Sequence, residues 1–401
     1  MLIEVANLRN QSMNCKHCGQ PNLEGAAYCG SCGKPMDLNE NSNTSSAQQK
    51  QSESKVQSSW MDSLNAYVGN SQPANLNWRV LFTDVFKSHT MEEAESIFIC
   101  GTKMTTPAPS EVSKDWPHPW LYSRVFLTLF VATVLLWICV SGFSNYKAMP
   151  GMIVVGSFAV PIAVMILFLE LNAWRNVSVF RVVQTFFVGG CASLATTLLL
   201  FKIYPVRELD YFGAFMTGVI EELGKAVIVY AFLRKLGKLS ILTGMLVGAS
   251  VGAGFSAFES AGYALEPLIS FFQYSGYAAA YGQELDEGLM LEAINHSLLL
   301  RGFLSPGGHV AWAAVTGAGL VIAAKEKGVF SAKLFFERKF MRLFVIPIVL
   351  HGVWDCPLAM QSGAVFHIAL SIIVWIVVLI LINMGLAEVN QESFKENQTD
   401  K

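Results

Sequence analysis

Charged residues are scarce in this sequence. Asp, Glu, Lys and Arg make up 14% of its 401 residues, whereas soluble domains carry roughly 25%. The two signs nearly cancel, with 28 basic against 30 acidic residues, so the net charge gives no reason to expect a nucleic-acid partner. Apolar residues make up 53% and, between Val125 and Leu386, form runs near the roughly 20 residues that cross a bilayer as a helix. The composition excludes an ordinary soluble protein and predicts an all-α polytopic membrane protein surrounded by lipid.

The sequence also lacks a disulfide framework, because the positions of its cysteines do not follow the spacing typical of disulfide-bonded domains. Four of the eight are isolated and are expected to be free, mostly apolar-facing thiols: Cys100, Cys139, Cys191 and Cys356. The other four form two CxxC pairs: Cys15, Cys18, Cys29 and Cys32. Two such turns can hold one tetrahedral ion, and an all-cysteine set is typical of structural zinc. We therefore predict a small zinc ribbon over residues 13–36, folded by its metal, with a redox role of the CxxC pairs as the alternative.

The segments around the ribbon differ in composition. The first forty residues lack the apolar core of a secretory signal peptide. Residues 37–75 are rich in Asn, Ser and Gln and predict a disordered linker. Residues 76–118 mix apolar and charged positions and predict an amphipathic juxtamembrane segment. We assign residues 119–388 to a transmembrane domain and residues 389–401 to a cytoplasmic tail.

The apolar runs predict about eight transmembrane helices. They lie near residues 121–143, 149–170, 182–203, 211–233, 239–264, 303–324, 343–362 and 364–387. The apolar run at 268–281 is too short to span, and we expect it to lie in the interface or to re-enter. With a cytoplasmic N-terminus, eleven basic residues lie in inner loops and four in outer loops, and the outer loop at 265–301 is acidic. This bias predicts that both termini are cytoplasmic.

Ionisable residues inside the spans are few, and each needs a reason because a charge within a membrane is costly. Away from the span ends, all of them except His367 fall in four short strings: EELGK at 221–225, GAGFSAFE at 252–259, GHVAW at 308–312 and HGVWD at 351–355. His367 stands alone in the last span and is expected to donate a hydrogen bond between helices. The candidate site residues in these strings are Glu221, Glu222, Lys225, Glu259, His309, His351 and Asp355. Helical spacing places both glutamates of the first string beside Lys225. The same spacing places Asp355 one turn from His351, where it could fix the tautomer of the imidazole.

In this order the four strings resemble the PrsW family of bacterial intramembrane proteases, which is distantly related to the type II CAAX prenyl endopeptidases. The family pattern is EExxK, GxGFxxxE, GHxxW and then HxxxD or HxxxN, and the resemblance covers residues 205–360. Ser260 stands where family members often have Asn. The resemblance implies a multi-pass intramembrane endopeptidase of the bacterial inner membrane. Its substrates would be membrane-embedded proteins such as anti-sigma factors.

The same residues point to hydrolysis without the resemblance. Two adjacent carboxylates beside a lysine share charge, so Glu221 or Glu222 could take a proton from water and return it to a leaving amine. His309 and His351 could stabilise the oxyanion, or could bind a catalytic metal together with Glu259. The HEXXH motif is absent, which favours the metal-free mechanism, and both mechanisms stay open.

Two other classes of function fit parts of the pattern. Carboxylates and histidines at mid-membrane also make the proton relays of transporters. Transporters usually show a repeat of broken helices, however, and EELGK and HGVWD each occur once. A non-enzymatic membrane scaffold, whose zinc ribbon binds a cytoplasmic protein, would leave the intramembrane charges unexplained.

Overall fold

The computed structural model describes residues 12–14, 20–23, 60–72, 76–113, 115–281 and 285–399. The chain divides into two compact units, Met1–Gln57 and Ser58–Lys401. The described part of the first unit contains an antiparallel pair of short strands, β1 (Ser12–Asn14) and β2 (Pro21–Leu23). The four cysteines of the predicted zinc ribbon lie outside the described residues: Cys15, Cys18, Cys29 and Cys32. The ribbon, its zinc and its cytoplasmic partner therefore stay predictions.

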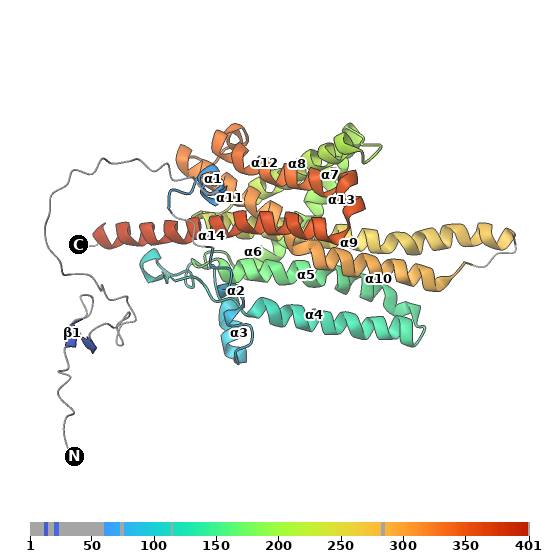
Figure 1. Ribbon diagram of the computed structural model, residues 1–401, viewed down its shortest axis with the longest axis horizontal. Coiled ribbons are helices and arrows are strands. Elements are labelled where there is room, and N and C mark those ends of the chain that lie inside the picture. Colours follow the sequence, from blue (N-terminus) through green and yellow to red (C-terminus); the bar gives the residue numbers. More distant parts are fainter. Residues whose placement is uncertain are drawn as a thin grey trace, which may run out of the picture. The chain divides into compact units, whose positions relative to one another are not determined.

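The second unit is a bundle of helices (Figure 1). Its first seven helices are α1 (Trp60–Val68), α2 (Val80–Thr83), α3 (Met91–Phe98), α4 (Leu121–Trp137), α5 (Met149–Leu171), α6 (Val179–Gln184) and α7 (Gly190–Ile203). The next seven are α8 (Tyr211–Leu233), α9 (Ile241–Ala280), α10 (Glu287–Leu304), α11 (His309–Lys327), α12 (Arg338–Trp354), α13 (Pro357–Ser362) and α14 (Ala364–Thr399). Two π-helical turns, Ile138–Gly142 and Thr185–Gly189, extend α4 and join α6 to α7.

Six helical stretches within the described residues are long and apolar enough to cross a membrane. They are Leu121–Gly142, Tyr146–Leu171, Val179–Ile203, Ile241–Ala278, Glu287–Lys327 and Ala364–Gln391. The stretch from Glu287 to Lys327 joins α10 and α11 through the 3-10 turn Ser305–Gly307. These stretches confirm an all-α polytopic membrane fold.

Two of the eight predicted spans are not among these six stretches. The span predicted at 211–233 forms α8 with the same bounds. The span predicted at 343–362 is divided, because α12 ends at Trp354 and α13 begins at Pro357. α8 carries three charged residues within five positions, and α12 has only 17 residues, short of the roughly 20 that cross a bilayer. The two helices pack against each other, and both also pack against α11. That both cross the membrane stays a prediction.

The prediction for residues 265–301 was wrong. In place of an interfacial run and an acidic loop, α9 continues as one helix of 40 residues with Pro267 inside it. At 1.5 Å per residue it is about 60 Å long, twice the roughly 30 Å of a bilayer core. Figure 1 shows the last part of α9 and α10 extending together past the end of α4. The helix continues through Pro267 because α10 packs along it and stabilises it, burying Ala264 and Ile294.

The segment before the first span is more structured than the sequence predicted. The prediction of a disordered linker was wrong for residues 60–68, which form α1 and pack against α14. The segment 76–118 contains α2 and α3, and is fixed to the loop between α5 and α6 by Cys100, whose thiol donates to the carbonyl oxygen of Val177 at 3.3 Å. Burial raises the pKa of this thiol, so the thiol keeps the proton that it donates.

The carboxylate of Glu170, at the end of α5, fixes the start of α4. It accepts hydrogen bonds from three consecutive backbone amides, those of Trp120, Leu121 and Tyr122, at 2.8–2.9 Å. The first amides of a helix have no partner within the helix itself, and a negative charge there is favoured by the helix dipole. Glu170 therefore supplies both partner and counter-charge, which fixes α4 against α5.

Helices α9 and α11 approach each other closely because glycines line their contact. A Cβ atom on Gly248 would lie 2.0 Å from the carbonyl oxygen of Ala313, and one on Gly317 would lie 2.0 Å from that of Gly244. Packing of small residues lets backbones approach in this way inside membranes. The contact brings the α11 residue His309 beside the second charged string on α9.

We expect Gly248→Ala to destabilise the protein by about 1–3 kcal/mol, the usual cost of overpacking, because the new methyl group would meet backbone atoms of α11. Thermal unfolding in detergent measures the effect as a lower Tm. Gly262→Ala is the matched control on the same helix, since a Cβ there meets nothing within 4 Å. Equal melting temperatures for the two variants would show that close packing of α9 on α11 does not stabilise the fold.

Candidate functional site

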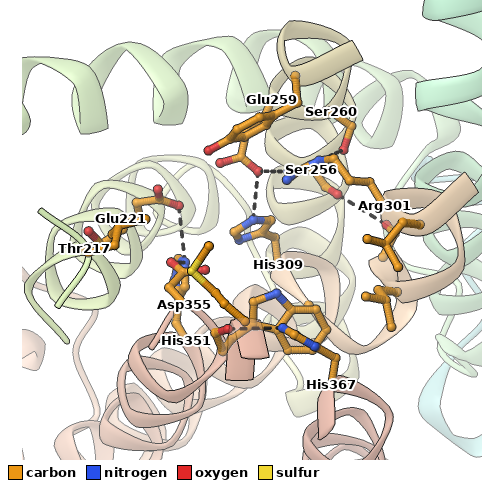
Figure 2. A pocket seen from close by; sticks show the side chains of 18 of the residues that line it. Thr217, Glu221, Ser256, Glu259, Ser260, Arg301, His309, His351, Asp355 and His367 are labelled. Carbon is orange, nitrogen blue, oxygen red and sulfur yellow. Dashed lines mark hydrogen bonds and ion pairs between the residues drawn. The ribbon is translucent and has the colours of Figure 1, made fainter. Parts of the chain in front are cut away.

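The four charged strings meet at a cavity of about 750 Å³. Its wall includes Glu221 of α8, Glu259 of α9, His309 of α11 and His351 of α12 (Figure 2). These helices are far apart in sequence, yet their ionisable side chains point towards one space. The prediction that the strings form one site agrees with this geometry.

Lys225 lies at the centre of the charged cluster and is completely buried. Its Nζ atom is 2.7 Å from Oε1 of Glu222 and 3.4 Å from Oε2 of Glu221. It is also 2.9 Å from Nδ1 of His309 and lies over the ring of Phe255 at 4.2 Å. An ammonium group can only donate, so Nδ1 of His309 accepts and its Nε2 carries the hydrogen.

The two adjacent glutamates occupy different surroundings. Glu221 lines the cavity with 7% of its surface exposed, whereas Glu222 is fully buried and does not line it. Oε1 of Glu222 accepts from Lys225 and from Nδ1 of His351 at 2.9 Å. Among the described residues, its Oε2 has no hydrogen-bond partner. Only Glu221 of the pair can therefore reach a molecule in the cavity directly.

His351 is held on both sides of its ring. Its Nδ1 faces the buried Glu222, and its Nε2 is 3.3 Å from Oδ2 of Asp355 and 3.7 Å from Oε2 of Glu221. Trp312 stacks on the imidazole with ring centroids 4.6 Å apart. The sequence predicted that Asp355 would lie beside His351, and Asp355 is near Nε2. The other ring nitrogen, Nδ1, points away from the cavity, and the carboxylate beside it is that of Glu222. Glu222 is thus placed to fix the tautomer and the orientation of His351.

Arg301 of α10 is a charged residue of the site that is not among the candidate residues predicted from the sequence. It forms an ion pair with Glu259, and its Nε donates to the hydroxyl of Ser260 at 2.9 Å. Glu259 also accepts from Nε2 of His309 at 3.0 Å. The signal for Arg301 was present in the sequence, because it is a lone charge in the apolar run LLLRGFL, and such charges need a partner.

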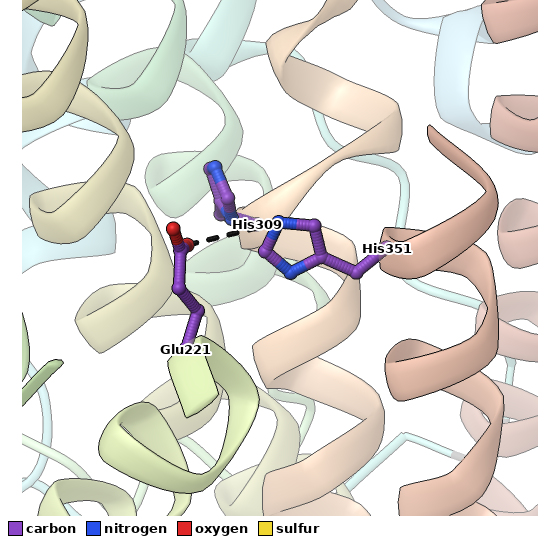
Figure 3. Close-up of side chains that lie close together, drawn as sticks. All are labelled: Glu221, His309 and His351. Carbon is purple, nitrogen blue, oxygen red and sulfur yellow. Dashed lines mark ion pairs between the residues drawn. The ribbon is translucent and has the colours of Figure 1, made fainter. Parts of the chain in front are cut away.

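Three side chains could hold a metal ion together. Ligand atoms of Glu221, His309 and His351 all lie within 4.8 Å of one another (Figure 3). Two imidazoles and a carboxylate are a donor set of catalytic zinc sites, so both the ligand types and the distances between the ligand atoms fit a zinc ion. The predicted set had Glu259 in place of Glu221, but Glu259 is engaged by Arg301. Both nitrogens of His309 are engaged as well, so metal binding there would replace one of its contacts.

Comparison with known proteins gives one match. A family model described as PrsW family intramembrane metalloprotease matches residues 152–382, more than half of the chain. No curated protein and no solved structure matches. The matched range contains all four charged strings and lies outside the segment of the predicted zinc ribbon. The word metalloprotease counts against the metal-free mechanism that the absence of HEXXH favoured.

We expect Lys225→Met to destabilise the protein by about 3–5 kcal/mol, because it removes the cation from a buried charge cluster and leaves two neighbouring carboxylates. Thermal unfolding in detergent would show this as a strongly lowered Tm. The double variant Lys225→Met/Glu222→Gln should recover much of the loss, since it also removes the most buried carboxylate. A single variant as stable as the parent would show that the cation does not hold the cluster together.

Proposed function

Because the chain belongs to the PrsW family of intramembrane metalloproteases, it is a membrane protease, and we propose that it cuts its substrates in the cavity bordered by Glu221. The observation that carries this proposal is the placement of carboxylates and imidazoles from four helices around one cavity. By the family resemblance, the substrates would be single-span membrane proteins of the anti-sigma-factor kind.

We propose that Glu221, His309 and His351 hold a catalytic metal, with zinc as the first candidate. When bound, the metal supplies Lewis-acid polarisation of the scissile carbonyl group. Glu222 supports the site from behind by accepting the Nδ1 hydrogen of His351, which leaves Nε2 facing the cavity side. Lys225 holds both glutamates in place from within the bundle.

The proton transfers fall to Glu221 in this proposal. Its Oε2 faces Lys225 and His351, and no hydrogen bond reaches its Oε1 from the described residues. We propose that one carboxylate oxygen of Glu221 would hold the metal, while the other takes a proton from the attacking water and returns it to the leaving amine, which is general acid–base work. Glu259, fixed by Arg301, would hold the ring of His309 during both steps.

The bias of basic residues in the loops supports one topology. We propose that both termini lie on the cytoplasmic side of a bacterial inner membrane. The end of α9 and the start of α10 then lie on the outer side. The predicted ribbon would stand in the cytoplasm, where a protein partner could reach it.

We predict that Glu221→Gln lowers cleavage of a single-span model substrate by a factor on the order of a hundred or more and abolishes metal binding by the transmembrane domain. Gln keeps the volume of the side chain but cannot accept a proton. Both readouts are made in a background with Cys15, Cys18, Cys29 and Cys32 replaced by Ser, so that ribbon metal is not counted.

Glu326→Gln is the matched control, because Glu326 is an exposed glutamate of α11 outside the cavity wall, and it should keep both activity and metal. Full cleavage by the Glu221→Gln variant would rule out Glu221 as the base. Cleavage by the metal-free background protein, unaffected by a strong chelator, would remove the metal from the proposal and leave the metal-free mechanism.

A further inference from the structure

Exposed tyrosines form a row that starts at the cavity and runs along helix α9 towards its end; the last of them, Tyr281, directly follows the final helical residue, Ala280. Four tyrosines are at least half exposed: Tyr263 at 50%, Tyr274 at 62%, Tyr277 at 71% and Tyr281 at 82%. We call these four residues the tyrosine track. Tyr263 belongs to the cavity wall, and the guanidinium of Arg301 lies over its ring at 4.2 Å. The track is therefore continuous with the proposed active site.

The periodicity of the helix puts the track on one face. At 3.6 residues per turn, the tyrosines fall within about 60° of the direction of Glu259, which lines the cavity. A second face of α9, with Ala264, Leu268 and Phe271, packs against a cluster of apolar side chains from α5 and α10. A third face carries exposed apolar residues without tyrosine, Ile269 and Phe272 among them. The tyrosines are thus segregated from both other faces.

Charge is almost absent from the track. The sequence from Pro267 to Tyr281 contains no ionisable group other than tyrosine, and between Tyr263 and Tyr281 the one charged residue on this face is the exposed Glu266. Tyrosine combines a large apolar ring with a hydroxyl that can donate or accept, and it loses little conformational entropy on binding. Such a surface suits an uncharged or basic polypeptide better than an acidic one.

A lipid surface does not account for the whole track. From Tyr263 to Tyr281 the helix rises about 27 Å, whereas the headgroup region of one leaflet is only about 5–8 Å thick. A row of that length is matched by about eight residues of extended chain. A substrate that crosses the membrane and enters the cavity also has a segment of chain just outside the membrane, and that segment could lie along this row.

We propose that the tyrosine track binds the segment of the substrate that lies just outside the membrane, in extended form and with neutral or basic character, and guides it to the cavity. The proposal rests on the proposed function, because it takes the substrate to be a membrane-spanning protein cut in that cavity. It adds a site of recognition outside the membrane, about which the four charged strings say nothing.

The test compares two full-length variants on two single-span model substrates. One substrate carries an extension of about ten neutral and basic residues on the side of the track, and the other lacks it. Tyr274→Ser/Tyr277→Ser should lower kcat/KM about tenfold for the extended substrate and leave the short one unchanged. Ile269→Ser/Phe272→Ser, on the other exposed face of the same helix, should behave as the parent on both.

The outcomes separate the track from the active site. Parental activity of the tyrosine variant on the extended substrate, or an equal loss on both substrates, would refute the track. A photo-crosslinking amino acid at position 277 should label the extended substrate; labelling of lipid or of a second copy of the chain instead would also refute it. If the parent cleaves neither substrate, the proposed function itself fails, and the track falls with it.

Discussion

The site depends on one buried cation. Lys225 has no exposure to solvent and touches two carboxylates and an imidazole that come from α8 and α11. Without its charge, two adjacent glutamates could not both be held inside a bundle of apolar helices, because uncompensated buried charge is strongly destabilising. The glycine contacts between α9 and α11 serve the same cluster, since they bring His309 within reach of both Lys225 and Glu259.

Helix geometry then gives the two glutamates different roles. Consecutive residues of an α-helix point about 100° apart, so Glu221 faces the cavity while Glu222 faces the interior, against His351. In our account Glu221 meets water and substrate, and Glu222 holds the imidazole that faces the same space. Arg301 extends this arrangement to α10, because its ion pair with Glu259 ties the hairpin to the ring of His309. Recognition outside the membrane and chemistry within it would thus share one connected set of side chains.

The local parts of this site follow from sequence spacing. Residues three and four apart share a helix face, which predicted the contacts of Lys225 with both glutamates and the approach of His351 to Asp355. The longer-range parts do not follow. Arg301 contacts Glu259 because α10 packs back along α9, which continues as a helix through Pro267. A proline in a sequence usually predicts the end of a helix, so this arrangement was not predicted. Which glutamate faces the cavity is decided by the packing of α11 and α12, and no spacing within α8 contains that information.

The central claim is that Glu221, His309 and His351 together hold one metal ion at the cavity. X-ray absorption spectroscopy of the purified protein, with the four ribbon cysteines replaced by serine, tests it most directly. The account predicts one metal per chain, with a first shell of nitrogen and oxygen atoms only, at about 2.0–2.2 Å, that loses nitrogen when His351 is changed to Ala. A protein that contains no metal and still cleaves a membrane substrate would contradict it.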